Sequence, residues 1–517
     1  FQLAEAGRAN LLRTQRMNVG DLAIQYPALV QQEQLLKNQL RQEEALLALA
    51  PTDAKQRQAK ITAFEKYQQF LKQVEKQHPG YYQALFSTAS PAVANIQQKL
   101  GDQTSLLEYF IGEEDYYIFA LSDDKFETIR LPKKTALLPE FKKIDASWKG
   151  LVAKGKASPG VYSKLENQAG TADLDQAIDG FLTAIQKIRP RELIDNGFQL
   201  YGKLIEPVEQ VIKHSENLII VPHGPLHQLP FEAIITQNVD AEKKLKYHKL
   251  NYLVKDYAIQ YAAFAGEVLT KSPPPSITEL EPFLAMAPIF TQDSIGSYIR
   301  ESNRFLFDTL YQSNAALRAI SSDGRLFQPL KHSEQEVRNI LQLFADKKVA
   351  TQAYFSDQAL ETTFKEEAPS YKYIHLATHS FVNRADSQFS GVAFFQAKAE
   401  QEDGILYLPE IYPLEMNAEL VVLSSCESGR GEYALGEGTL SLTRAFLVAG
   451  ADHVLSTLWN VYDRYASELM TEFYGELLKD KTTAAALRKA KLKMIGDKDT
   501  ANPKIWSGFI LSGKWLD

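Results

Sequence analysis

The chain has 517 residues, of which 45% are hydrophobic and 23% charged, a composition typical of ordinary globular proteins with material for roughly two to four domains. The net charge of −7 argues against a nucleic-acid-binding surface as the main function, and the single cysteine excludes an intrachain disulfide and a thiolate zinc cage. No apolar run approaches the length of a membrane span and no signal peptide is visible, so we expect a cytoplasmic protein with no membrane partner. Because the first residue is Phe1 rather than Met, we also expect the chain to be a piece of a longer protein.

The first hundred residues have a helical pattern. Pro27 suits the first turn of a helix that runs to about residue 49, and the sequence Pro51-Thr52-Asp53 interrupts the pattern. In a second predicted helix, apolar residues alternate spacings of three and four at Phe64, Tyr67, Leu71 and Val74. We expect these two helices to form an antiparallel hairpin, followed by a third short helix over residues 90–101.

After residue 101, short apolar and β-branched runs replace the helical pattern. Strands are expected at 106–110, 116–121, 126–131, 217–221, 257–262, 282–286, 373–378, 392–395, 420–425 and 454–458. Helices are expected at 333–343, 439–449 and 465–478, the first opened by the capping box Ser333-x-x-Glu336. This alternation is typical of a mainly parallel sheet flanked by helices. The predicted fold class is therefore α/β, preceded by an all-α helical-hairpin segment.

Two reactive side chains follow predicted strands of this sheet. Cys426 follows the strand 420–425 and precedes a polar, glycine-rich loop, and His379 follows the strand 373–378. In a parallel α/β sheet, the working residues lie beyond the carboxyl ends of the strands. If these strands are neighbours, the thiolate can attack a carbonyl while the imidazole promotes thiolate formation and protonates the leaving amine. The backbone N–H groups of Ser380 and Cys426 are the candidate oxyanion donors.

Other interpretations of these residues are open. A lone cysteine is usually a small core hydrophobe. His375 lies in mid-strand between apolar neighbours, so we expect a core or supporting histidine. The spacing of His375 and His379 would suit metal ligands on a helix, but the pattern predicts a strand without an intervening acid, so no metal site is expected. The segment Gly150–Lys156 is spaced like a phosphate loop but is followed by Ala157, and we expect a solvated loop and no cofactor.

A series of short motifs occurs in a fixed order between Phe198 and Trp515. The motifs are Val221–Leu226, Leu229–Glu232, His375–His379, Leu423–Gly429, Gly436–Gly438, Arg444–Phe446, Ala449–Ala451, Leu458–Val461 and Trp506–Phe509. This series resembles the CHAT domain, a caspase-like cysteine peptidase module that is akin to separase and is often attached to tetratricopeptide repeats. The 47 residues from His379 to Cys426 also fit the histidine-to-cysteine spacing of about 50 found in caspases.

The resemblance implies a caspase-like fold and a cysteine endopeptidase that cleaves a protein substrate, with His379 and Cys426 as the catalytic dyad. The family usually has Gly after the catalytic His, whereas this chain has Ser380. The implied domains are a helical linker over 1–101, an N-terminal part of the CHAT region over 102–270 and a catalytic subdomain over 271–517. The helical front end suggests an activating protein partner, and other family members suggest regulated cell death or anti-phage defence in bacteria.

Two acidic residues are candidates for substrate binding. Asp463 precedes a predicted helix, where it is either the N-cap or an acid at the base of the substrate pocket; the likeness to separase favours the acid. Glu437, between two glycines, is the second candidate. We therefore expect a basic residue before the scissile bond. The alternative function is a catalytically latent scaffold, and the presence of both dyad residues counts against it.

Overall fold

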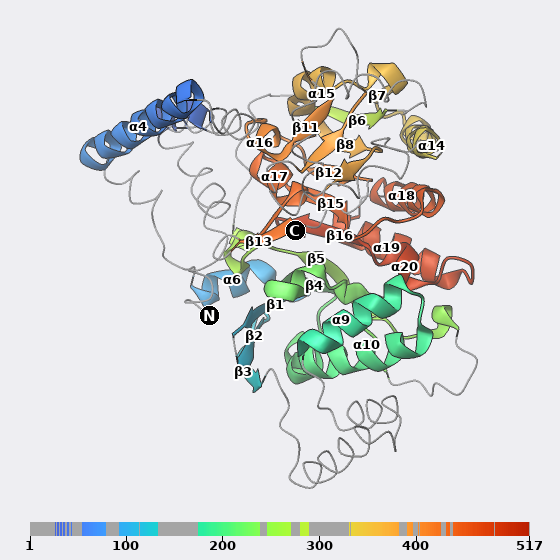
Figure 1. Ribbon diagram of the computed structural model, residues 1–517. Coiled ribbons are helices and arrows are strands. Elements are labelled where there is room, and N and C mark those ends of the chain that lie inside the picture. The colour runs from blue at the N-terminus through green and yellow to red at the C-terminus, as the bar shows by residue number, and fades with distance from the viewer. Residues whose placement is uncertain are drawn as a thin grey trace, which may run out of the picture. The chain divides into compact units, whose positions relative to one another are not determined.

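The structure is a computed structural model in which helices and strands alternate along the chain (Figure 1). The described residues are 26, 28–29, 32–33, 35–36, 39–40, 43, 54–78, 92–112, 114–132, 174–237, 246–269, 280–288, 330, 332–381, 390–395, 402, 404–424, 431–434, 438–479 and 481–515. They divide into a larger unit (residues 1–96, 260–490 and 508–517) and a smaller unit (residues 97–259 and 491–507). The domain boundaries expected from the sequence remain predictions.

The smaller unit contains the three strands expected after residue 101. Its elements are β1 (Thr104–Ile111), β2 (Asp115–Leu121), β3 (Phe126–Pro132), α9 (Leu174–Gln186), α10 (Pro190–Leu204), α11 (Glu209–Ile212), β4 (Asn217–Val221) and α20 (Pro503–Trp506). The strand order is β3-β2-β1-β4, in which β1 runs parallel to β4 and the other two pairs are antiparallel. Helices α6 (Val93–Leu100) and α19 (Thr483–Gly496) and strand β5 (Ala258–Tyr261) begin in one unit and end in the other.

The larger unit contains the strands that lead to the candidate site. Its elements are α4 (Ala54–Gln77), β6 (Glu281–Ala287), α14 (Ser333–Asp346), β7 (Gln352–Phe355), α15 (Glu361–Glu367), β8 (Tyr371–Leu376), β9 (Ser380–Phe381), β10 (Gly391–Ala393), β11 (Ile405–Tyr407), α16 (Leu408–Ile411), β12 (Leu420–Leu423), β13 (Gly431–Ala434), β14 (Gly438–Ser441), α17 (Leu442–Val448), β15 (His453–Thr457), α18 (Asp463–Leu477) and β16 (Phe509–Gly513). In the order β16-β15-β12-β8-β6-β7, only the pair β15–β16 is antiparallel. The expected α/β fold class, with a mainly parallel sheet flanked by helices, is confirmed.

Strand β8 divides its side chains between two faces of the sheet. Ile374 and Leu376 join a cluster of buried apolar residues, whereas His375 between them contacts Tyr474 of α18. This is the period-two alternation of a strand that is covered on both faces. Figure 1 shows α16 and α17 beside one face and α14 and α18 beside the other.

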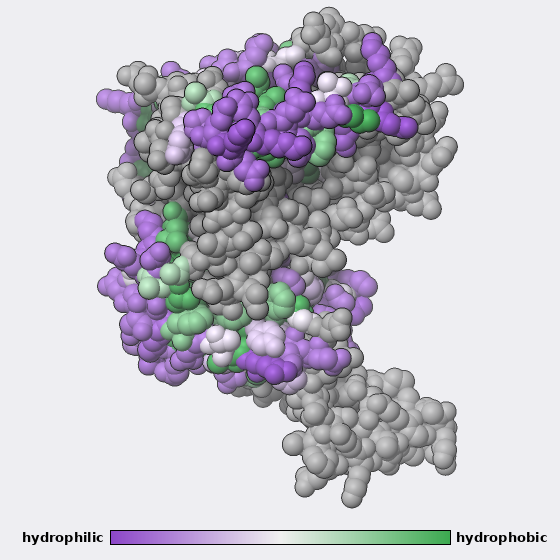
Figure 2. Space-filling view, turned by 90° about the vertical axis from the view of Figure 1, so that its left-hand side faces the viewer, coloured by the Kyte–Doolittle hydropathy of each residue, from purple (hydrophilic) through white to green (hydrophobic). Residues whose placement is uncertain are grey.

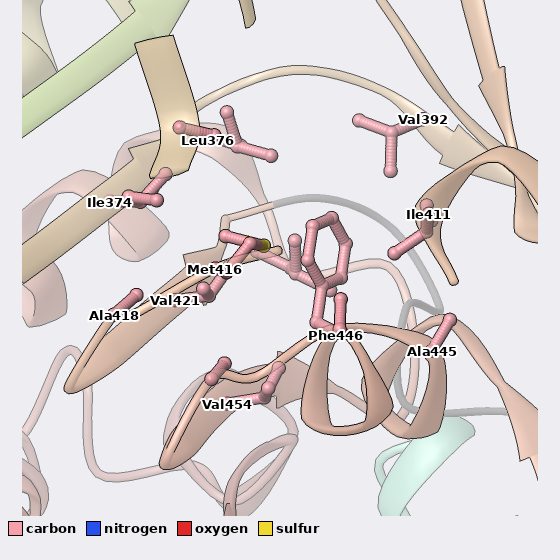
Figure 3. Close-up of a cluster of buried hydrophobic side chains, with 14 of the residues drawn as sticks. Ile374, Leu376, Val392, Ile411, Met416, Ala418, Val421, Ala445, Phe446 and Val454 are labelled. Atoms are coloured by element: carbon pink, nitrogen blue, oxygen red, sulfur yellow. The ribbon is translucent and has the colours of Figure 1, made fainter. Parts of the chain in front are cut away.

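The apolar face is closed by short helices. Figure 3 shows side chains from three parallel strands pointing toward those of α16 and α17, and all of them are buried. The labelled members are Ile374, Leu376, Val392, Ile411, Met416, Ala418, Val421, Ala445, Phe446 and Val454. Each large side chain in such a cluster contributes about 1.5–3 kcal/mol by leaving water, so this packing fixes the strands that carry the site.

Two sequence-based expectations about helices are wrong in detail. The helix expected from residue 439 begins at Leu442, because residues 438–441 pair as β14 with β13 in an antiparallel hairpin. In α4, Phe64 is 49% exposed; Val74 is buried as expected, and Ala63 and Phe70 complete the buried face. The Tyr67 hydroxyl donates to Glu33 Oε1 at 3.0 Å, so the two expected N-terminal helices do contact each other.

The surface of the described residues is mixed in character. On the face drawn in Figure 2, hydrophilic residues predominate and hydrophobic ones are scattered among them. Among the helices that the structure describes, none is both long enough and apolar enough to cross a membrane.

A buried ion pair holds the smaller unit together. Lys491 Nζ lies 2.7 Å from Glu232 Oε1, and each side chain is only 1% exposed. Burial lowers the pKa of Lys491, and the nearby Glu232 carboxylate opposes that shift. Breaking a buried pair costs far more than an exposed pair contributes, because the remaining charge stays in a poorly solvated place.

Replacing Lys491 with Met is expected to lower the free energy of unfolding by about 3–5 kcal/mol. Lys493, an exposed residue of the same helix, provides the matched control, and Lys493→Met should change it by less than about 0.5 kcal/mol. Urea unfolding of the intact chain measures both. Equal effects of the two substitutions would contradict the stabilising role of the pair.

Candidate active site

The strand that leads to His379 and the strand that leads to Cys426 are neighbours in the sheet. β8 and β12 pair in parallel with Leu376 opposite Leu423, and the Ser424 N–H donates to the Leu376 carbonyl oxygen at 3.0 Å. In the sequence, His379 lies three residues beyond Leu376 and Cys426 three residues beyond Leu423. Cys426 itself lies outside the described residues. The sequence predicted that His379 and Cys426 face one crevice if their strands are neighbours, and the two strands are neighbours.

The backbone that carries His379 is fixed on several sides. The Ala377 N–H donates to the Met286 carbonyl of β6 at 2.9 Å, and Thr378 Oγ1 donates to the Ala393 carbonyl at 2.6 Å. The Ala393 N–H in turn donates to the His379 carbonyl at 2.9 Å. These bonds from β6 and β10 hold the half-buried His379 at the carboxyl end of β8.

Ser380 begins β9 and is buried. It lies opposite Val392 in the antiparallel pair β9–β10, and the flanking bond runs from the Ala393 N–H to the His379 carbonyl. This pattern makes Ser380–Val392 a non-hydrogen-bonded pair, in which the N–H of Ser380 is directed away from β10. The direction of this N–H is therefore compatible with the oxyanion role expected from the sequence.

Asp463 does not cap its own helix. It is the first residue of α18, Tyr462 occupies the N-cap position, and no side chain caps this helix. Asp463 Oδ2 instead accepts a hydrogen bond of 2.6 Å from the backbone N–H of His332, at the start of α14. The N-cap alternative is therefore wrong for α18. Glu437, the second acidic candidate, lies outside the described residues.

The environment of Asp463 raises the pKa of its carboxyl group. Burial is the largest cause, and the negative charge of Glu336 adds to it. The hydrogen bond from the His332 N–H and the electrostatic interactions with His332 and His379 act in the opposite direction. Burial therefore makes the Asp463 carboxyl harder to ionise than that of an exposed aspartate.

The expected capping box of α14 is also wrong. Ser333 is the first residue of the helix rather than its N-cap, and its hydroxyl donates to the Leu330 carbonyl. Glu336 is buried, and its Oε1 accepts from His375 Nε2 at 2.8 Å. The other ring nitrogen of His375 lies 3.3 Å from the Tyr474 hydroxyl. The expectation that His375 is a core or supporting histidine is confirmed.

A signal for the role of Glu336 was present in the sequence. At helical spacing, Glu336 shares a face with the apolar residues Val337, Ile340 and Phe344, all of which are buried. A capping glutamate would instead turn back toward the exposed start of the helix. An acid on the apolar face of a helix requires a buried partner, and the only histidine within β8 provides it.

The motif residues Trp459 and Gly508 fix the segment before Asp463. A Cβ atom at Gly508 would lie 2.8 Å from the Trp459 indole, so the ring packs where only glycine leaves room. The Leu458 N–H donates to the Gly508 carbonyl at 2.8 Å. This contact anchors the connection from β15 to α18, which carries Asp463.

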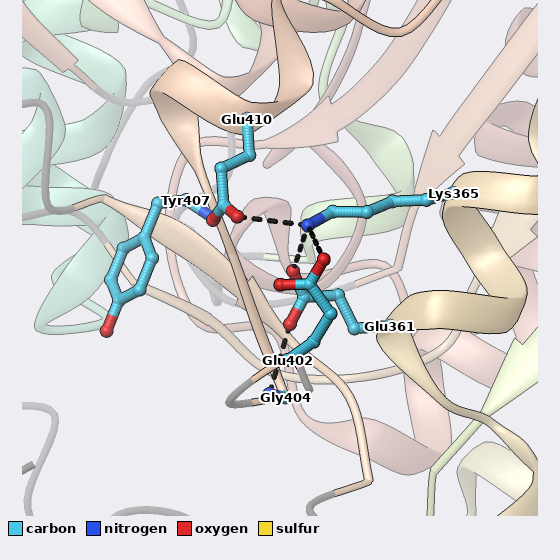
Figure 4. A network of polar contacts seen from close by, with 6 residues as sticks. All are labelled: Glu361, Lys365, Glu402, Gly404, Tyr407 and Glu410. Atoms are coloured by element: carbon cyan, nitrogen blue, oxygen red, sulfur yellow. Dashed lines mark hydrogen bonds and ion pairs between the residues drawn. The ribbon is translucent and has the colours of Figure 1, made fainter. Parts of the chain in front are cut away.

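One cluster of carboxylates in the described residues has the spacing of a cation site, and a lysine occupies its centre. The cluster consists of Glu361, Glu402 and Glu410. Figure 4 shows Lys365 Nζ directed at all three, at 2.7, 2.8 and 3.0 Å. Burial alone would lower the pKa of Lys365, but the carboxylates outweigh burial and raise it. The ammonium group therefore supplies the positive charge that a metal ion would bring.

Comparison with curated proteins gives two relatives of the same name. The chain is 23% identical to tetratricopeptide repeat protein 28 of Homo sapiens over 352 residues, 61% of this chain and 13% of that protein. It is 35% identical to tetratricopeptide repeat protein 28 of Mus musculus over 109 residues, 21% of this chain and 4% of that protein. The chain thus spans a small part of the length of these relatives.

Among solved structures, the separase–securin complex of Saccharomyces cerevisiae matches with a TM-score of 0.42 at 11% identity, covering 94% of this chain and 37% of that chain. The arginine-specific cysteine proteinase gingipain R matches with a TM-score of 0.35 at 9% identity, covering 63% of this chain and 68% of that chain. Residues 195–514, more than half of the sequence, match the CHAT domain family. The chain therefore belongs to the CHAT domain family.

Proposed function

We propose that the chain is a cysteine endopeptidase with Cys426 as nucleophile and His379 as general base and acid. The observation that carries the proposal is the parallel pairing of β8 with β12, with Leu376 opposite Leu423. Ligand sites in such sheets form beyond the carboxyl ends of the strands, and the proposed dyad follows two adjacent ends. Membership of a caspase-like family related to peptidases supports the same reaction.

In the proposed mechanism, His379 takes the thiol proton and the Cys426 thiolate attacks the scissile carbonyl carbon. The electron pair of the C=O bond moves to oxygen, and the N–H groups of Ser380 and Cys426 stabilise the resulting oxyanion. Collapse of this intermediate breaks the C–N bond, and the His379 imidazolium protonates the leaving amine. Water, deprotonated by His379, then hydrolyses the thioester and regenerates the thiol.

For substrate specificity, we propose that Asp463 binds a basic side chain before the scissile bond. The electrostatic interaction of this half-buried carboxylate with His379 supports the proposal. A guanidinium or ammonium group would form a charge-assisted hydrogen bond with this acid. Glu437 remains a second candidate from the sequence.

The N-terminal helices are the proposed contact for an activating protein partner. The large apolar side chains of Leu35, Ile61 and Phe64 are exposed on them by 59%, 43% and 49%. Exposed apolar side chains of this kind can be covered by another protein. A cytoplasmic setting and a role in bacterial defence or cell death stay predictions.

A thiol-reactive electrophile tests the dyad directly, because Cys426 is the only cysteine in the chain. We expect rapid labelling of the wild-type protein and labelling slower by about 100-fold or more in His379→Ala, since general-base assistance is worth about that much. His248→Ala, a change in the smaller unit, is the control and should leave the rate unchanged. Equal rates for wild type and His379→Ala, with or without candidate partners, would favour the latent scaffold.

Asp463→Asn separates charge from hydrogen bonding at the specificity site. The amide oxygen of Asn can still accept from the His332 N–H, but its neutral side chain attracts no cation. Cleavage after Arg or Lys should fall by about 10- to 100-fold, whereas thiol labelling of Cys426 should not change. Glu468→Gln, a partly exposed position of α18 paired with Arg464, is the control. An unaltered preference for basic residues in Asp463→Asn would exclude this role.

The pH dependence of cleavage gives a further check on Asp463. Its carboxyl group must be ionised to attract a basic side chain, and burial raises its pKa. As the pH falls, the wild-type enzyme should therefore lose cleavage after Arg at a higher pH than an ordinary aspartate would dictate. This loss should be absent from Asp463→Asn when the KM for an Arg peptide is followed. Identical pH profiles of KM would contradict the assignment.

A further inference from the structure

The face of β8 opposite the apolar cluster contains a buried polar pair that packing alone does not require. Glu336 and His375 are both buried, with 2.8 Å between Oε1 and Nε2. Around them the same face is aromatic: the rings of Phe283 and Phe344 lie 4.4 Å apart between centroids, and that of Tyr474 lies 5.5 Å from Phe283. An apolar pair would fill such a site at lower desolvation cost. Stability alone therefore does not explain why this pair is polar.

A continuous path of hydrogen bonds runs from this pair to Asp463. The backbone N–H of Glu336 donates to the His332 carbonyl at 2.8 Å, and the His332 N–H donates to Asp463 Oδ2 at 2.6 Å. The side chain of Glu336 is bonded to β8 while its backbone is bonded to the residue that holds Asp463. The position of the first turn of α14 therefore determines where the His332 N–H points.

The path closes on itself through α18. His375 Nδ1 lies 3.3 Å from the Tyr474 hydroxyl, and Tyr474 and Asp463 belong to the same helix. Burial raises the pKa of Tyr474 well above its ordinary value, so the hydroxyl keeps its proton and can donate to Nδ1. The imidazole Nε2–H is then directed at Glu336. One ring of polar contacts, which includes Asp463, thus joins β8, α14 and α18.

We infer that Glu336 and His375 are positioning residues for Asp463, holding its carboxylate ready for a basic side chain of the substrate. This inference rests on the proposed function. Because Oδ2 is occupied by the His332 N–H, the carboxylate is fixed in orientation and the second oxygen is the one presented to a cation. Binding groups that are displaced by about 1 Å can lose about 100-fold in rate, so the support behind Asp463 affects substrate selection.

The test compares Glu336→Ala, Glu336→Gln and the control Glu334→Gln. Glu334 lies in the same first turn but is only partly buried and pairs with Arg338. Glu336→Ala should raise KM for peptides with Arg before the scissile bond by about 10- to 100-fold, with little change for matched peptides with a neutral residue there. Glu336→Gln keeps an oxygen acceptor for His375 Nε2–H and should restore most of the wild-type KM. Glu334→Gln should not differ from wild type.

A purely structural role predicts a different result. Glu336→Ala would then unfold at a lower temperature, while the ratio of KM for Arg and neutral peptides would equal that of wild type; this result would overturn the inference. If Glu336→Ala does not fold, Tyr474→Phe takes its place, because it keeps the ring and removes the hydroxyl that holds His375. It should shift the same ratio in the same direction, and an unchanged ratio would again overturn the inference.

Hydrogen exchange of the His332 amide makes the test independent of catalysis. Exchange should be faster in Glu336→Ala than in wild type or Glu334→Gln, because the amide loses its fixed acceptor at Asp463. Unchanged exchange in Glu336→Ala would overturn the inference even in an active enzyme. If the wild-type protein cleaves no peptide, the proposed function fails, and the exchange rate still decides whether Glu336 holds the bond to Asp463.

Discussion

The parallel pairing of β8 with β12 is the interaction on which the candidate site depends. With Leu376 opposite Leu423, each strand directs one set of side chains into the apolar cluster and the other toward α14 and α18. A slip of one residue would reverse these faces, placing His375 among apolar side chains and Leu376 against Glu336. The buried polar pair therefore disfavours a wrong register, and the apolar cluster favours the right one. Correct register keeps His379 and the strand before Cys426 at adjacent strand ends.

The two faces of this sheet serve different purposes. The apolar face supplies bulk stability through side chains that interlock with α16 and α17, as Figure 3 shows. The opposite face carries the polar contacts of Glu336, His375 and Tyr474, which join three elements with directional bonds. Directional bonds fix geometry, which apolar contacts do less strictly. That division suits a site in which the Asp463 carboxylate must be held in a fixed orientation.

The sequence predicted those parts of the site that depend on short-range patterns. The strand before His379 and the strand before Cys426 were visible as apolar runs, and their motifs resembled the correct family. Glu336 was misassigned because a capping box and a buried acid on the first turn share the same spacing from Ser333. The partner of Asp463 was not predictable, since His332 lies 131 residues away and contributes only a backbone N–H, which no residue type encodes. The hairpin before Leu442 was missed because local preference for a helix extended across residues whose pairing with β13 decided otherwise.

The most direct measurement of the central claim is a proteome-wide cleavage profile of the wild-type chain against Cys426→Ala, with any activating partner supplied to both. The account predicts new protein termini in the wild-type sample that follow Arg or Lys and are absent from the Cys426→Ala sample. Identical profiles in the two samples would contradict a peptidase that depends on Cys426. Cysteine-dependent cleavage after Asp or small apolar residues would retain the dyad but contradict the role of Asp463.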